Sequence, residues 1–535
     1  MAKVRMRCSG MGLLFTLAAL FACSGRPVPS TPHTLTIAVE NDIQTLDPAI
    51  LSDPFTSRIL WQMYEGLLGL DAQGVPIPLI AESWQADHGF RHWTFKLRPS
   101  VYYHESPLFA APSHTRPVNA YDVLYSYHRF AAGFGSFVFS GVVEGFTEFV
   151  KHQTDSVKGF VVLDSLTFQF RLLQAEPTFV YRLASPYLGI MPPEVVEHDP
   201  HRFGRTICVG SGPFKLLRRT ETEVLLERHP RYWRRTLGNL QQILFRVEKN
   251  PQLRINQFES RVYDVLQVPI AFIPRYVRGE AIKPELANRY RLLRGTTYNV
   301  HYLGLNCRDL QDVHLRRAIA FAVNKAEIVR SLLYDQAQIA TSPVPPGMQG
   351  YQPPEGLRFN PDSCRQELAA SAYRGEPLTV LVSDAPNSEQ LGQIIQSDLA
   401  RVGIRTTLQK LDFNSLLSRI FSGDKPDLFI LFSEWIFSAP EFIIESYHSE
   451  RWPNPNLFGY RNPWVDQQLN EWRKKSEREQ INAICRRAES VALSEAPAVW
   501  LFHLYNLYVT DHRLTQFNVN ANHYWDLADA LWQEE

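Results

Sequence analysis

The sequence lacks the short motifs that mark the large enzyme classes. It has no Gly-x-Ser-x-Gly nucleophile elbow, no His-Glu-x-x-His zinc motif, no phosphate-binding loop and no dinucleotide-binding fingerprint. The nearest approach to an elbow is Gly210-Ser211-Gly212, and there Pro213 removes a backbone N–H that an oxyanion site would need. We therefore predict a protein that is not an enzyme and that uses no cofactor and no metal.

Cysteine is scarce, with six in 535 residues. No two of them form a Cys-x-x-Cys pair, so the spacing needed for thiol redox chemistry or for a zinc ribbon is absent. Two lie near the N-terminus, at positions 8 and 23, and the other four allow three pairings into two disulfides, which the sequence leaves open. These four are Cys208, Cys307, Cys364 and Cys485.

Neither sign of charge is in excess, because 55 basic residues balance 55 acidic ones. A chain without a net field has no general attraction for nucleic acid or for an anionic membrane surface, so we expect no nucleic-acid partner. Beyond the N-terminal segment, charged side chains interrupt each apolar run within about ten residues, and a membrane-spanning helix needs roughly 20.

The N-terminus carries a pattern typical of export. Three of the first seven residues are basic, and an apolar run covers residues 11–21. This arrangement is typical of a secretory signal peptide and is too short for a membrane span. Cys23 follows Leu20-Phe21-Ala22, which resembles the lipobox of bacterial lipoproteins.

The lipobox resemblance implies that residues 1–22 are a signal peptide and that the Cys23 sulfur carries a diacylglycerol. Residues 23–34 hold three prolines and are typical of a tether between the lipid and a folded domain. We expect an exported protein, lipid-anchored at the periplasmic or cell-surface face of a membrane.

The remainder mixes strand-like and helix-like patterns. Trp93, Phe95 and Leu97 alternate with polar residues, which predicts a strand. Asp312 and Asn324 each precede a run with apolar residues at helical spacing, and Asn324 has a glutamate three residues later, as in a capping box. Two helices are therefore predicted to begin at these positions.

One region predicts parallel strands. An apolar strand at 378–382, a helix that starts at 387 and stops at Gly403, and an alternating strand at 404–411 follow one another. A strand–helix–strand order forces parallel pairing with a right-handed crossover, and ligands of such sheets bind at the strand ends. The predicted fold class is α/β.

Short motifs occur in a fixed order between residues 78 and 435. They are PLIAESW (78–84), WTFKLRP (93–99), VNAYDV (118–123), GSGPFK (210–215), ERHPRYW (227–233), LRRAIAFAVNK (315–325), SPVPPG (342–347) and Glu434-Trp435. The series resembles the oligopeptide- and dipeptide-binding proteins of bacterial ABC importers, the family 5 extracellular solute-binding proteins.

The resemblance implies a two-lobed, periplasmic-binding-protein-like fold. Lobe one would comprise 35–300 plus 505–535, with an extra subdomain at about 60–180, and lobe two would comprise 301–504. The lobes would close by a hinge on an oligopeptide, which a monomeric protein would deliver to a permease and ATPase complex. Peptide binding by strand addition gives affinity that is independent of the peptide sequence.

Individual ligand-binding residues are implied by the same resemblance. Tyr302 matches a tyrosine on a crossing strand, and Trp435 matches the tryptophan of the cleft loop. Three residues later the family carries an aspartate that pairs with the peptide α-ammonium group, whereas this sequence has Ser438. A hydroxyl cannot replace that charge, and losing one side of such a pair costs about 3–5 kcal/mol. Glu434 and Glu441 are the candidate replacements. Further candidate contacts are Ser52, Trp500 and Phe502.

Two other functions stay open. The same fold could bind a non-peptide solute such as a metal chelate or haem, with His301 beside Tyr302 as an iron ligand. Alternatively, a surface lipoprotein of this kind could be an adhesin or a sensor, which needs neither transport nor a closing cleft.

Overall fold

The computed structural model describes residues 34–51, 54–133, 135–185, 187–345, 347–385 and 387–534. The predicted signal peptide, the lipidation site at Cys23, nearly all of the tether and the candidate contact Ser52 lie outside the described residues. Within those ranges, the structure contains no helix that combines the length and the apolar character needed to cross a membrane.

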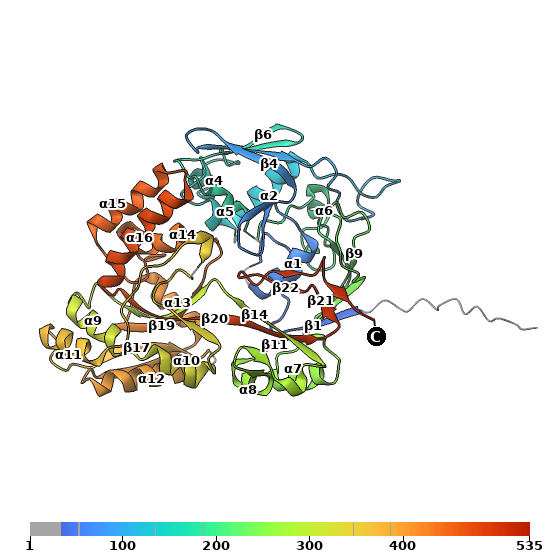
Figure 1. The fold of residues 1–535 in the computed structure, drawn as a ribbon. Helices are drawn as coiled ribbons and strands as arrows, with labels where there is room; N and C mark the ends of the chain where they lie inside the picture. Colours follow the sequence, from blue (N-terminus) through green and yellow to red (C-terminus); the bar gives the residue numbers. More distant parts are fainter. Residues whose placement is uncertain are drawn as a thin grey trace, which may run out of the picture.

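A twelve-stranded sheet runs through the whole molecule, and one strand, β20 (Ala498–Asp511), belongs to both of its halves. Residues 505–511 of β20 pair with β14 (Tyr290–Thr296), while residues 498–502 pair with β15 (Asn299–Leu305). Nearly all of β20 is buried, which agrees with its mostly apolar sequence. We interpret the change of partner as the passage from one lobe to the other (Figure 1).

The first half-sheet is built on β1 (Thr34–Val39), whose residues alternate between buried and half-buried positions. β1 pairs in parallel with β10 (Gln242–Val247). The half-sheet continues through β9 (Glu223–Arg228) to β8 (Phe214–Arg219), both antiparallel, and β11 (Val265–Gln267) joins β1 to β20. Helix α1 (Pro54–Met63) contacts β8.

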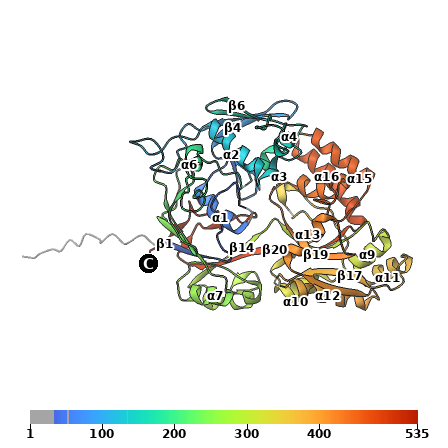
Figure 2. The same ribbon diagram turned by 180° about the vertical axis from the view of Figure 1, so that it is seen from behind.

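The second half-sheet contains the predicted strand–helix–strand unit. β17 (Leu378–Ser383) pairs in parallel with β18 (Thr406–Leu411), and α12 (Ser388–Arg401) connects them, so the prediction of parallel pairing is confirmed. β19 (Leu428–Glu434) lies between β17 and β15. In both views, α12 and α10 (Lys325–Leu333) lie along the lower side of this half-sheet (Figures 1 and 2).

Both predicted helix starts are confirmed. The Asp312 carboxylate accepts a hydrogen bond from the His314 N–H at the start of α9 (Val313–Ala322). The Asn324 side chain accepts one from the Glu327 N–H at the start of α10. Each cap satisfies a backbone donor that the first turn of a helix leaves without a partner.

The remaining helices of the second lobe bracket the site described below. α13 (Phe413–Ser422) follows β18, α14 (Pro440–Ile444) follows β19, and α15 (Pro463–Glu471) packs against α16 (Arg478–Ser494), which leads into β20.

A separate four-stranded sheet lies at the top of the molecule in Figure 1. Its strand order is β4 (Ala81–Ala86), β5 (His92–Leu97), β7 (Thr167–Arg171) and β6 (Phe160–Asp164). The predicted strand at Trp93, Phe95 and Leu97 is confirmed in β5, where all three side chains are buried. Helix α2 (Ala120–Ala132) packs on the sheet through Tyr127, whose ring lies 5.5 Å from that of Phe170.

Cys208, Cys307, Cys364 and Cys485 are free thiols, so none of the three disulfide pairings left open by the sequence is formed. Burial raises the pKa of Cys208 to about 12 and that of Cys307 to about 11, which keeps both thiols protonated and unreactive.

A side chain stabilises the passage between the lobes. Asn299 is buried, and its side-chain oxygen accepts a hydrogen bond from the Leu504 N–H at 3.0 Å. The Asn299 backbone carbonyl accepts one from the His503 Nδ1–H at 2.6 Å. Asn299 thus supplies two hydrogen-bond acceptors to residues of β20, at the point where β20 changes from one neighbouring strand to the other.

Replacing Asn299 by alanine should lower the free energy of unfolding by about 1–3 kcal/mol, because the buried Leu504 N–H loses its acceptor. Urea denaturation measures the change. The exposed Asn414→Ala is the control and should stay within about 0.5 kcal/mol of the unaltered protein. Equal stability of the two variants would contradict this role for Asn299.

Candidate functional site

Three contiguous pockets extend from the first lobe into the second. The largest, called the chamber, has a volume of about 670 Å³ and is lined by α1, by the hairpin of β2 (Leu68–Leu70) and β3 (Pro76–Pro78), and by residues 518–526. Residues 184–185, 232, 234, 295–298 and 347–348 also contribute to its wall. Its size lies in the range that takes small-molecule and peptide ligands.

A small junction pocket of about 60 Å³ connects the chamber to the second lobe. It shares Trp61 and Tyr298 with the chamber, and it shares Glu434 and Trp435 with a third pocket of about 290 Å³. We call the third one the aromatic pocket, because rings make up much of its wall. The shared residues make the three pockets neighbours along one path.

Tyr302 and Trp500, both singled out in the sequence, lie together in the wall of the aromatic pocket. Their ring centroids are 5.1 Å apart, and the Phe458 ring packs against both at 5.6 Å. The Tyr302 hydroxyl is 3.3 Å from the Ser433 hydroxyl, and only 1 % of Tyr302 is exposed. Tyr302 therefore contributes an apolar ring surface to the pocket.

Phe502, another candidate from the sequence, packs against His301. The His301 ring is stacked between Phe502 at 4.6 Å and Phe432 at 5.4 Å. Burial, and then the neighbouring His503, lower the pKa of His301 to about 3, so the imidazole is neutral. Phenylalanines from both neighbouring strands therefore flank the half-buried His301 ring on the surface of the sheet.

Glu434 occupies the wall between the junction pocket and the aromatic pocket, at the end of β19. Its carboxylate is 3.5 Å from the His523 Nε2 atom. Burial and then the nearby Arg58 guanidinium lower the pKa of His523 to about 3, so this imidazole carries no charge at neutral pH. Burial raises the pKa of the Glu434 carboxyl, while Arg58 opposes the shift.

Glu441, the other candidate acid, lies in a different environment. Its side chain is fully buried in α14, and one carboxylate oxygen accepts a hydrogen bond from Arg478 Nη1 at 2.7 Å. The Arg478 guanidinium also lies over the Tyr181 ring, 5.2 Å from its centroid. The structure thus gives Glu441 a hydrogen-bonded guanidinium partner, whereas the neighbours described for Glu434 are the His523 imidazole at 3.5 Å and the charge of Arg58.

Ser438 contacts the opposite lobe. Its side chain is fully buried, and its hydroxyl donates a hydrogen bond to the Gly74 carbonyl at 2.6 Å. Gly74 forms the tip of the β2–β3 hairpin with a left-handed φ of 74°, and an added Cβ would lie 2.7 Å from the Tyr298 hydroxyl. Gln349 Nε2 donates to the same carbonyl at 2.8 Å.

The hairpin tip was not identified from the sequence. A local signal exists, because the Asp71-Ala72-Gln73-Gly74 segment has the composition of a tight turn, but Gly74 and Ser438 are far apart in the chain. A backbone carbonyl therefore lies against Ser438, the residue at which the sequence resemblance implies an aspartate. Ser438 is a point of contact between the lobes.

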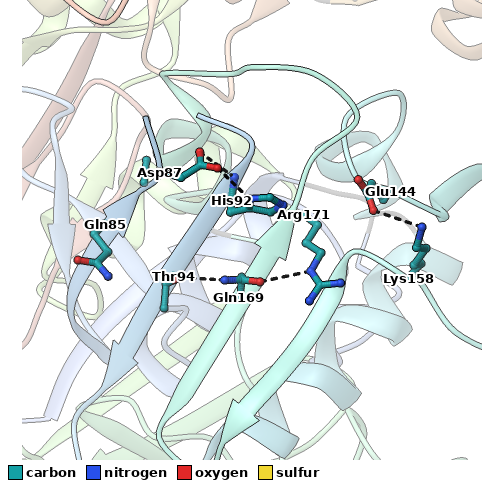
Figure 3. A pocket seen from close by; sticks show the side chains of 9 residues that line it. Gln85, Asp87, His92, Thr94, Glu144, Lys158, Gln169 and Arg171 are labelled. Atoms are coloured by element: carbon teal, nitrogen blue, oxygen red, sulfur yellow. Dashed lines mark hydrogen bonds and ion pairs between the residues drawn. The ribbon is translucent and has the colours of Figure 1, made fainter. Parts of the chain in front are cut away.

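A fourth pocket, of about 560 Å³, lies away from this path on the open face of the four-stranded sheet. Figure 3 shows its polar side chains in pairs: Thr94 with Gln169, Gln169 with Arg171, and Asp87 with His92. Glu144 and Lys158 form a further pair at 3.7 Å, so most of the labelled polar side chains have a partner on this face.

Among the described residues, no group of three histidine, cysteine, aspartate or glutamate side chains is arranged to hold a metal ion.

The fold and the row of pockets between two half-sheets define a two-lobed solute-binding protein. The chain belongs to family 5 of the bacterial extracellular solute-binding proteins, whose model matches residues 75–454. This confirms the family resemblance and the two-lobed α/β fold predicted from the sequence.

Individual relatives are distant. The chain is 24 % identical over 430 residues to the di/tripeptide-binding protein 2 of Pseudomonas aeruginosa, covering 77 % of this chain and 78 % of that one. It is 22 % identical over 467 residues to heme-binding protein A of Haemophilus influenzae, and the match covers 83 % of this chain and 82 % of that protein. The structure of HbpA2 from Haemophilus parasuis is similar, with a TM-score of 0.79, 21 % identity and coverage of 94 % and 100 %.

Restoring the family's aspartate should weaken closure. In Ser438→Asp a carboxylate replaces a hydroxyl that donates to the Gly74 carbonyl, so two acceptors face each other in a buried site. We expect small-angle X-ray scattering to give a larger radius of gyration for Ser438→Asp than for the unaltered protein. The matched Ser438→Ala, which removes the bond without adding charge, should lie between them. A Ser438→Asp protein as compact as the original would contradict this contact.

Proposed function

We propose that this protein captures short peptides between its two lobes and delivers them to the permease of an ABC importer. The observation that carries the proposal is the row of contiguous pockets with the Glu434 carboxylate at its centre. Membership of a solute-binding family and the peptide ligand in the name of a relative support it.

Glu434 is the proposed partner of the peptide α-ammonium group. Its described ion-pair neighbour His523 is neutral, and 41 % of the Glu434 side chain is exposed, so a ligand ammonium group could reach the carboxylate and add to the compensation that Arg58 provides. Glu441 is less suited to this role, since Arg478 already binds it. Ser438 is occupied by the Gly74 carbonyl.

The aromatic pocket would then hold the side chain of the residue that carries the ammonium group. Trp435 and Glu434 stand between it and the junction pocket, so a peptide terminus at Glu434 would place its first side chain among Tyr302, Trp500 and Phe458. Burying a large apolar side chain there contributes about 1.5–3 kcal/mol.

The cellular setting belongs to the same proposal. A diacylglycerol on Cys23, followed by the proline-containing tether at 23–34, would hold a monomer at the outer face of a membrane near its permease and ATPase. One acyl chain binds a membrane only marginally, whereas the two or three acyl chains of a lipoprotein anchor hold the protein firmly.

We also propose that the lobe boundaries lie at 300/301 and 504/505 and that lobe one has a subdomain at about 60–180.

Haem or a metal chelate is the second candidate ligand, since one relative is named as a heme-binding protein. In this chain, however, the one histidine proposed as an iron ligand, His301, is stacked between Phe432 and Phe502. The geometry therefore favours a peptide. The other alternative, a surface adhesin or sensor, would not need the two lobes to close on a ligand, and we therefore rank it below peptide capture.

Isothermal titration calorimetry with Phe-Ala-Ala tests the role of Glu434. Glu434→Gln should weaken binding at least about 30-fold, because the bound peptide would cover this exposed carboxylate and losing one side of the resulting buried charge pair costs about 2–5 kcal/mol. Acetylating the peptide N-terminus should weaken binding to the unaltered protein by a similar factor. The unaltered protein and Glu434→Gln should then bind the acetylated peptide with the same affinity.

The exposed Glu450→Gln serves as the matched control and should bind as the unaltered protein does. Full affinity of Glu434→Gln for the free-amine peptide would show that the ammonium group binds elsewhere. Absence of binding for every peptide tested would overturn the proposed function itself.

A further inference from the structure

The wall of the chamber has an excess of carboxylates. Of its described lining residues, Glu65, Asp71 and Asp526 are acidic and Arg234 is basic. The whole chain has no net charge, so this excess is local to the cavity. A cavity with walls of low polarizability focuses such a charge on a bound ligand.

Arg234 does not cancel this excess, because two carboxylates already share it. Its Nη2 atom lies 3.4 Å from Asp529 and 3.9 Å from Asp526. Burial, and then the Asp529 carboxylate, raise the pKa of Asp526. Two acids next to one base leave a net negative charge on this side of the chamber.

Glu65 adds a carboxyl group on a neighbouring wall. Its two oxygens accept hydrogen bonds from the Tyr232 hydroxyl at 2.7 Å and from the Trp233 Nε1–H at 2.8 Å. Burial raises its pKa to about 7, so a nearby ligand cation would favour its charged form.

Asp71 lies on the hairpin that forms another wall. Its Oδ1 atom accepts hydrogen bonds from the N–H groups of Gln73 and Val75, which fixes the side chain in place at the turn. The carboxylate is therefore presented to the chamber by a rigid loop, without an ion-pair partner among the described salt bridges.

Rings and an unsatisfied hydroxyl complete a site for a long cationic chain. Trp61 and Tyr524 are 5.0 Å apart and line the same cavity, where their faces can contact methylene groups and a cation. The Ser185 hydroxyl also lines the chamber, is 3 % exposed and has no hydrogen-bond partner among the described residues. A buried polar group of this kind calls for a partner on the ligand.

We propose that the chamber selects a positively charged side chain of the captured peptide, of the lysine or arginine type. This inference rests on the proposed peptide-binding function and adds a preference to it. The carboxylates of Asp71 and Asp526 attract the cation, and the Trp61 and Tyr524 rings pack along its methylene chain. A peptide with a glutamate in the same place is repelled.

Calorimetry with matched peptides tests this preference. The reference peptide is Phe-Ala-Ala. Lysine is then placed at the second position (Phe-Lys-Ala) or at the third (Phe-Ala-Lys), and each of these peptides is compared with versions that carry norleucine or glutamate instead. Norleucine keeps the length of lysine without its charge. At one of the two positions, lysine should bind at least about tenfold more tightly than norleucine, and glutamate more weakly than either.

Asp526→Asn should reduce the ratio of the affinity for the lysine peptide to the affinity for the norleucine peptide at least about threefold. The exposed Asp155→Asn is the matched control and should keep the full ratio. If the lysine and norleucine peptides bound with equal affinity at both positions, the charge preference would be overturned. Binding of Phe-Ala-Ala in the same experiment would still support the peptide-binding function. Failure of all the peptides to bind would overturn both.

Discussion

The backbone pairing of β20 is the constraint on which the structure depends. One buried strand hydrogen-bonds to β14 in one half-sheet and to β15 in the other, so neither lobe has a complete sheet without it. Unpaired backbone groups in a buried strand are costly, and the lobes therefore stay joined at this line when they move. The pockets lie on both sides of the same line, with Tyr298 and Glu434 close to the crossing.

Charge compensation explains which acids are available to a ligand. Arg478 is hydrogen-bonded to Glu441 inside the second lobe, whereas Glu434 lies beside the neutral His523 imidazole and within the influence of Arg58. The lining of the chamber has three carboxyl groups and one guanidinium group. Ser438, at the position where the family has an aspartate, bonds instead to the hairpin of the opposite lobe. The position where the resemblance implies a carboxylate thus makes a contact between the lobes, and the proposed binding charge is that of the neighbouring Glu434.

Local features were predictable from the sequence and distant contacts were not. The helix starts at Asp312 and Asn324 depend on hydrogen bonds within three residues, and the parallel strands of the second lobe depend on a strand–helix–strand order. The site residues contact partners that are distant in the sequence. Gly74 and Ser438, for example, form a hydrogen bond although 364 positions separate them along the chain. No periodicity encodes that meeting, so the sequence could nominate both Glu434 and Glu441 and could not distinguish them.

Native mass spectrometry of the protein, purified without denaturant, tests the central claim most directly, because a binding protein that closes on its ligand tends to retain it. We expect a set of bound masses that correspond to short peptides, with lysine- or arginine-containing sequences enriched among them. A single bound mass that fits no peptide would contradict the account and would mean that the change to Ser438 accompanies a different class of solute.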